Sequence, residues 1–170
     1  MGNTDSLAGV SIINGFKSAG VKTIVAVPDI VTCDHMLWPI SRDEELKLVM
    51  VCKEDEGVSV CAGMSYADHR AVLLIQHTGF LDSVNAIRAM GMDYQLPIVM
   101  AVGLQGMEVD KLPSESKHNG ILILEPILQA MNISYSLLLQ DSDAAGIFES
   151  IDQAYKITRP HVFLIVRSPV

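Results

Sequence analysis

The chain has 170 residues, of which 49% are hydrophobic and 19% are charged, which fits one ordered domain and excludes a disordered chain. Twelve basic residues against 20 acidic ones give a formal net charge of −8, so neither nucleic acid nor an anionic membrane is an expected partner. The three cysteines show no CxxC spacing, which argues against a disulfide framework and a cysteine zinc site. Unpaired thiols predict a cytoplasmic protein, and no apolar run reaches the ~18 residues of a membrane span.

The first predicted elements are a helix and a buried strand. Thr4 or Asp5 is placed to cap the helix, and Gly20 ends it after Ala19. The predicted core face of this helix consists of Leu7, Val10, Ile13 and Phe16. Residues 22–27 form an apolar strand that stops at Pro28.

The rest of the chain continues to alternate between helices and strands. In order, the expected elements are helix 33–40, strand 46–52, helix 54–68, strand 71–76, helix 81–92, strand 97–102, helix 121–131, strand 134–139, helix 142–157 and strand 161–166. Residues 103–120 are polar, carry charges of both signs and contain a proline, which predicts a long surface loop of the kind that often has a function.

Apolar strands that alternate with helices predict a parallel sheet covered on both faces. We expect one domain over residues 1–170, an α/β protein folded as a three-layer α/β/α sandwich with a six-stranded parallel sheet. Ligands of such sheets bind beyond the carboxyl ends of the strands. The segments expected there are 27–29, 53–54, 76–79 and 103–106.

Several common functional motifs are absent from the sequence. There is no dinucleotide-binding GxGxxG, no P-loop, no GxSxG nucleophile elbow and no HExxH. The five histidines have no metal-ligand spacing, so no metal ligand is predicted in this chain. A receiver-like domain stays open on architecture alone, although Asp29 stands without the second acidic residue that such a domain needs.

Two segments carry a more specific pattern. Residues 51–63 read VCKEDEGVSVCAG, and residues 74–86 read LIQHTGFLDSVNA, followed by LPIVMAVG at 96–103. Together they resemble the pyrimidine-binding (PYR) domain of thiamine diphosphate enzymes, and most of all the sulfopyruvate decarboxylase alpha subunits and the N-terminal half of phosphonopyruvate decarboxylases. The resemblance implies the thiamine diphosphate-binding fold of the PYR type.

The resemblance also assigns candidate site residues. The family's catalytic glutamate precedes an Ala-Gly pair by eight and nine positions, and counting back from 62–63 selects Glu54, with Glu56 as the rival because it directly precedes a glycine. His77 stands where the closest relatives carry asparagine, and we assign it a catalytic role as a carboxylate ligand or proton carrier. The implied cofactor-binding residues are Val27, Pro28, Asp29, Glu54, Gln76, Thr78, Gly79 and Asn85. His35 and Arg88 are weaker candidates for meeting an anionic substrate.

In this family a glutamate against N1′ of the aminopyrimidine activates the thiamine diphosphate, and a dry setting raises the pKa of such a carboxyl group. The chain has no Gly-Asp-Gly segment, which the family uses to hold the diphosphate and Mg²⁺. The resemblance therefore implies a beta subunit that supplies this PP domain, in an α2β2 or larger assembly.

The implied function is the alpha subunit of a thiamine diphosphate-dependent decarboxylase. Its substrate would be a small anionic 2-oxo acid such as sulfopyruvate or phosphonopyruvate. A carboligase or acyl-transferring lyase would use the same residues and stays open. A non-catalytic α/β binding module of the same fold is the third hypothesis.

Overall fold

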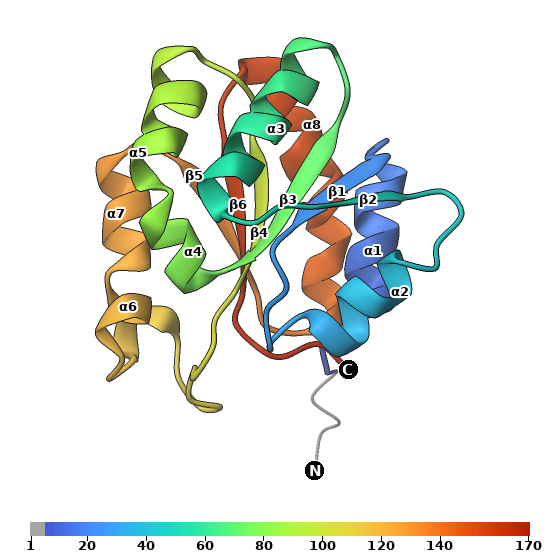
Figure 1. Ribbon diagram of the computed structural model, residues 1–170. Helices are drawn as coiled ribbons and strands as arrows, with labels where there is room; N and C mark the ends of the chain where they lie inside the picture. Colours follow the sequence, from blue (N-terminus) through green and yellow to red (C-terminus); the bar gives the residue numbers. More distant parts are fainter. Residues whose placement is uncertain (1–5) are drawn as a thin grey trace.

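The computed structural model describes residues 6–170 and contains a sheet of six parallel strands in the order β2-β1-β3-β4-β6-β5 (Figure 1). The strands are β1 (Thr23–Ala26), β2 (Lys47–Met50), β3 (Ala71–Gln76), β4 (Val99–Gly103), β5 (Ser134–Leu138) and β6 (His161–Ile165). The predicted six-stranded parallel sheet is confirmed.

Helices cover both faces of this sheet. One face carries α1 (Gly9–Ser18), η1 (Cys33–Leu37), α2 (Trp38–Ile40), η4 (Asp141–Gly146) and α8 (Ile147–Ile157). The other carries α3 (Glu54–Tyr66), α4 (His77–Asp82), α5 (Val84–Ile87), α6 (Asn119–Leu122) and α7 (Leu124–Ala130). The remaining short elements are η2 (Arg88–Asp93) and η3 (Pro113–Glu115). The protein is therefore the predicted three-layer α/β/α sandwich.

The central strands are largely apolar because both of their faces are buried. Along β1, Ile24 and Ala26 face the core under α1 and α8, whereas Val25 faces the core under α3. The edge strands β2 and β5 are only partly buried, so the expectation of full burial holds for the four inner strands and not for these two.

Some predicted boundaries are wrong. Val10, expected in the core, is 61% exposed, because α1 buries positions 9, 12, 13 and 16 instead. Thr4 and Asp5, the expected caps, lie outside the described residues, and the N-cap is Ala8. The helix expected at 81–92 begins at His77, directly after β3, and Ser83 divides it into α4 and α5. None of the helices in the described range is long and apolar enough to cross a membrane.

Candidate functional site

The carboxyl ends of the inner strands lie at one edge of the sheet. The register pairs Ala26 of β1 with Leu74 of β3, and Gln76 of β3 with Gly103 of β4. The segments that follow β1, β3 and β4 therefore meet, and α3 begins beside them after β2. This edge is the lower one in Figure 1, where the loop between β4 and α6 also lies.

Glu54 is the first residue of α3, and its half-buried side chain lies directly over Gly79 in the first turn of α4. A β-carbon added at Gly79 would lie 2.3 Å from both Cγ and Oε1 of Glu54, so only glycine leaves room for this carboxylate. Within residues 6–170 no group donates a hydrogen bond to the Glu54 carboxylate. It is therefore held in place by packing, with its acceptor oxygens unused.

Glu56, the alternative candidate, caps the start of α3. Its Oε2 accepts hydrogen bonds from the backbone N–H groups of Cys52, at 3.0 Å, and Lys53, at 3.2 Å. A glutamate three residues inside a helix commonly caps it in this way. Glu56 is exposed and its carboxylate is occupied, so the structure favours Glu54 over Glu56 as the free acidic group.

His77 is the first residue of α4 and is only 7% exposed. Its Nδ1 is fully buried and has no hydrogen-bond partner among the described residues. Burial lowers the pKa of His77 and the nearby His118 adds to this effect, whereas the Gly103 carbonyl and the Asp29 charge oppose it. A buried, unpaired imidazole nitrogen normally costs free energy, which makes His77 a candidate for contact with a ligand.

Asp29 follows β1 and shapes the loop in which it lies. Its Oδ1 accepts the backbone N–H groups of Val31, at 2.7 Å, and Thr32, at 3.2 Å, and its Oδ2 accepts the Thr32 hydroxyl. The same Oδ1 would lie 3.0 Å from a β-carbon at Gly103, so the carboxylate rests against the end of β4. Asp29 thus sits in the predicted site, but its oxygens are engaged within its own loop.

The other predicted site residues differ in how close they lie to Glu54, His77 and Asp29. Gln76 accepts a 2.8 Å hydrogen bond from the exposed Thr78 hydroxyl, and both flank His77. Val27 is half-buried and Pro28 exposed at the end of β1. Asn85, in contrast, is exposed on α5 and bonds Arg88, which also pairs with Asp93.

For the described part of the chain, no hydrogen bond or ion pair joins Asn85 or Arg88 to the Glu54–Gly79 pair, and His35 is exposed on the opposite helical layer. Among those residues, also, no three His, Cys, Asp or Glu side chains are grouped to hold a metal ion.

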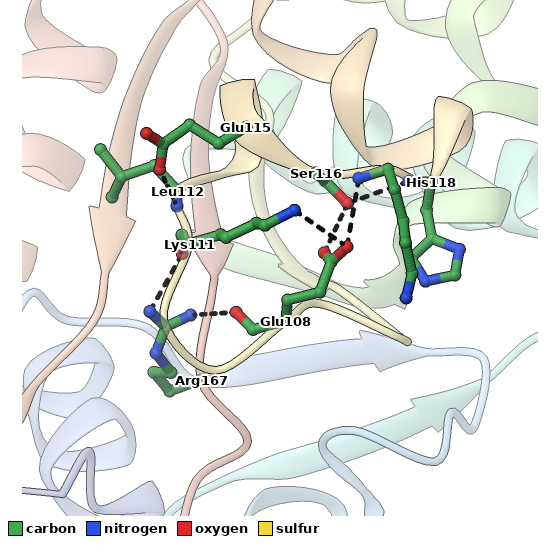
Figure 2. Close-up of polar contacts among 8 residues, drawn as sticks. Glu108, Lys111, Leu112, Glu115, Ser116, His118 and Arg167 are labelled. Atoms are coloured by element: carbon green, nitrogen blue, oxygen red, sulfur yellow. Dashed lines mark hydrogen bonds and ion pairs between the residues drawn. The ribbon is translucent and has the colours of Figure 1, made fainter.

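The predicted loop after β4 is folded around Glu108 (Figure 2). Glu108 Oε1 accepts the Lys117 backbone N–H at 3.1 Å, and Oε2 accepts the Ser116 hydroxyl at 2.8 Å. Ser116 Oγ in turn accepts the His118 backbone N–H at 3.2 Å. Burial acts to raise the pKa of Glu108, but the hydrogen bonds from Lys117 and Ser116 outweigh it and lower the pKa to about 2.

Arg167, just after β6, anchors the other side of this loop. Its guanidinium donates to the backbone carbonyls of Glu108, at 3.4 Å, and Lys111, at 3.0 Å (Figure 2). A hollow of about 610 Å³ lies beside it, lined by residues that include Val31 and Gly106. A larger hollow of about 840 Å³ lies at the opposite edge of the sheet, around Gly20 and Arg70, and contains none of the predicted site residues.

Glu108, His118 and Arg167 are not indicated by the sequence. Each lies outside the motifs that carry the resemblance, and no spacing links them. Only the return of the loop to the end of β4 places the His118 ring against Gly106, where a β-carbon would lie 3.6 Å from its Nε2. The polar composition of 103–120 was the one available signal.

Comparisons with known proteins agree with the resemblance. No protein-family model matches the chain. It is 23% identical over 158 residues to the sulfopyruvate decarboxylase of Methanosarcina acetivorans, a match covering 91% of this chain and 38% of that protein. It is 33% identical over 98 residues to sulfopyruvate decarboxylase subunit alpha of Methanothermobacter thermautotrophicus, covering 58% of this chain and 59% of that one. The chain thus matches less than two thirds of the length of either relative.

A solved structure shares the fold. It is the 2-oxoglutarate:ferredoxin oxidoreductase from Magnetococcus marinus, with a TM-score of 0.65 and 15% identity over 95% of this chain and 29% of that chain. The predicted resemblance to sulfopyruvate decarboxylase alpha subunits and the predicted fold class are therefore confirmed.

Proposed function

We propose that this chain is the PYR-domain alpha subunit of a thiamine diphosphate-dependent decarboxylase that acts on a small anionic 2-oxo acid, such as sulfopyruvate or phosphonopyruvate. The similarity to sulfopyruvate decarboxylase chains supports the reaction class. The arrangement of side chains at the carboxyl edge supports the site. Residues 1–170 form one PYR-type domain in this proposal.

The observation that carries the proposal is the free carboxylate of Glu54 over Gly79. A group that exchanges a proton with a cofactor must keep its oxygens available to it. Glu54 meets this condition, since no group in residues 6–170 donates a hydrogen bond to it, whereas Glu56 does not. Because Gly79 has no side chain, the Glu54 carboxylate can pack directly against the first turn of α4.

The residues around Glu54 fit the ring end of thiamine diphosphate. The absence of a side chain at Gly79 lets the Glu54 carboxylate lie against α4, and the Nδ1 of His77 is a buried polar atom without a partner in the described chain. When bound, the cofactor supplies the carbanion and the electron sink that decarboxylation requires. Glu54 would hold a proton against the aminopyrimidine, while Val27, Pro28 and Gln76 would border the ring.

The contacts support two of the other assignments. Asp29 holds the loop after β1 in shape, and through it the wall of the site. His77 would face the substrate, either as a ligand for its carboxylate or as the carrier of the proton that enters the product. Thr78 and Asn85 remain assigned to the cofactor site by the resemblance.

The partner in this proposal is a beta subunit with a PP domain. This chain has no Gly-Asp-Gly segment, so the diphosphate and Mg²⁺ would be held by that subunit, with the cofactor at the interface. The name "subunit alpha" of the relatives supports a partner chain. The assembly would be α2β2 or larger, which light scattering on the co-purified complex would measure.

The test is co-expression with a beta subunit that carries the Gly-Asp-Gly segment, followed by measurement of thiamine diphosphate binding and of CO₂ release from sulfopyruvate. Glu54→Gln should lower turnover by ~10²–10⁴-fold without preventing assembly. Glu56→Gln is the matched control, because glutamine keeps the oxygen that caps α3. Wild-type turnover in Glu54→Gln would refute the assignment, and failure of the complex to bind the cofactor would refute the proposed function.

A further inference from the structure

The hollow of about 610 Å³ beside Arg167 has no role in the site as proposed so far. It lies between the loop after β1, the loop after β4 and the end of β6. Its apolar walls consist of Ile30, Val31, Leu104, Met107, Val109 and Val166. Arg167 is the only charged side chain among the described residues that line it. The hollow therefore offers one cation within a largely apolar lining.

The Arg167 guanidinium binds only backbone carbonyls within residues 6–170. It donates to the carbonyl of Lys111, at 3.0 Å, and to those of Glu108 and Val166, each at 3.4 Å (Figure 2). A guanidinium has five N–H groups, and these three bonds use only Nη1 and Nη2. The Nε–H has no acceptor in the described chain. The side chain can therefore hold its loop and still donate hydrogen bonds to a ligand.

No acidic side chain of the described range neutralises this cation. Residues 6–170 contain no ion pair that includes Arg167. The Glu108 carboxylate, in the loop that Arg167 anchors, lies 3.7 Å from Lys111 Nζ and accepts the Ser116 hydroxyl (Figure 2). Asp110 is exposed and lines, together with Arg167, an adjoining hollow of about 440 Å³. A half-buried cation without an acidic partner is stabilised when an anion binds beside it.

The hollow adjoins the candidate site through the end of β4. Val31, in its wall, lies against Gly103, where a β-carbon would be 2.9 Å from Val31 Cβ and 3.0 Å from Asp29 Oδ1. In the sheet, β4 separates β6 from β3, so these two strands lie about 10 Å apart at the usual strand spacing. The hollow and the candidate site therefore lie at the same edge of the sheet and share the loop after β1.

We propose that the hollow beside Arg167 is an oxyanion site and that it receives the charged tail of the substrate, a sulfonate or phosphonate on a short carbon chain. The guanidinium supplies planar N–H donors and a charge that persists at every physiological pH. The apolar walls would contact the carbon chain, as in most small-molecule sites. The identity of the ligand as the substrate rests on the proposed function, whereas the binding of an oxyanion at Arg167 does not.

The first test titrates the full chain with propane-1-sulfonate and, as a neutral probe of similar shape, propane-1-sulfonamide. The sulfonate should bind saturably in calorimetry or NMR, and the sulfonamide should not. Arg167→Lys should weaken binding by about tenfold or more, since a charge-assisted pair of hydrogen bonds is lost.

A second variant leaves the Arg167 side chain and its loop bonds in place. Val109 lines the hollow and is 75% exposed, so Val109→Glu should fold normally and place a carboxylate beside the guanidinium. It should weaken sulfonate binding by about tenfold as well. Val10→Glu, at a 61% exposed position of α1 that does not line the hollow, makes the same charge change and should bind like wild type. Circular dichroism confirms that each variant is folded.

Four outcomes of the titration would overturn the oxyanion site. They are no binding of the sulfonate, equal binding of the sulfonamide, wild-type affinity in Val109→Glu, and equal weakening in Val10→Glu. In the assembled enzyme, Val109→Glu should raise KM for sulfopyruvate about tenfold and leave KM for pyruvate, whose tail is a methyl group, unchanged. An equal rise for both oxo acids would overturn the assignment of the hollow to the substrate tail. If the complex shows no decarboxylation, the proposed function fails, while the sulfonate titration still decides the oxyanion site.

Discussion

Replacing Gly79 with alanine should lower turnover strongly and the free energy of unfolding only slightly. The new β-carbon would lie 2.3 Å from Cγ and Oε1 of Glu54 and 2.4 Å from its Cδ, whereas carbon atoms pack at ~3.5–4 Å. The Glu54 side chain must therefore move by more than about 1 Å. Because Glu54 is only half-buried, it can rotate away from the helix toward solvent, and the fold survives.

The two effects on stability nearly offset each other. Alanine in place of a helical glycine stabilises by about 0.5–1 kcal/mol, and overpacking costs ~1–3 kcal/mol. The free energy of unfolding should fall by at most about 2.5 kcal/mol, which corresponds to a Tm decrease of at most about 10 °C. Turnover of the assembled enzyme should fall by about 100-fold or more, because an acid–base group displaced by ~1 Å loses most of its effect.

Gly63→Ala is the matched control. Gly63 lies in α3, it is exposed, and a β-carbon there would have no neighbour within 4 Å. Alanine at this position should raise the free energy of unfolding by ~0.5–1 kcal/mol and leave turnover unchanged. Thermal unfolding and steady-state kinetics on both variants make the comparison. Full turnover in Gly79→Ala would show that the position of the Glu54 carboxylate over Gly79 has no role in catalysis.

Two further predictions concern stability. The buried imidazole of His161 bonds the Ser134 and Ser136 hydroxyls, and burial lowers its pKa from 6.5 to about 4. The folded state therefore loses stability as the pH falls from about 6.5 through 4, by up to about 3 kcal/mol, and is unaffected by this group above 6.5. Urea unfolding of His161→Gln should lack this part of the pH dependence; an identical pH profile would contradict it. Asp29→Ala removes the acceptor of two backbone N–H groups and of the Thr32 hydroxyl. It should lower the free energy of unfolding, measured with urea, by ~2–4 kcal/mol. A decrease below ~0.5 kcal/mol would show that these hydrogen bonds do not stabilise the loop.

The sheet, and with it the carboxyl edge at which the candidate residues lie, could be predicted because the signals are local. Continuous apolar runs identified the buried strands, and the resemblance selected Glu54 over Glu56 by its spacing from the Ala-Gly pair. The two glycines of α3 differ in their surroundings: a β-carbon at Gly57 would lie 2.5 Å from Leu73 Cδ1, whereas Gly63 faces open space.

What could not be predicted depends on long-range contacts. The Arg167 guanidinium bonds the Glu108 carbonyl across 59 residues of sequence, and no local pattern in 103–120 indicates that anchor. The start of α4 at His77 was missed for a related reason. The next helix was expected only at residue 81, but α4 begins directly after β3, and its Gly79 lies beneath the Glu54 side chain. The first turn of α4 is therefore also the surface against which the Glu54 carboxylate packs.

The two glutamates at the start of α3 differ in their hydrogen bonds. A helix start needs acceptors for its free N–H groups, and Glu56 supplies one to Cys52 and Lys53. With that task met, Glu54 has no hydrogen bond to maintain within residues 6–170 and can be exchanged for glutamine at little cost in stability. Had Glu54 been the cap, its oxygens would be shared with backbone donors and unavailable to a cofactor. The capping by Glu56 therefore leaves the Glu54 oxygens free, so the loss of turnover that the proposed function predicts for Glu54→Gln should come without loss of folding.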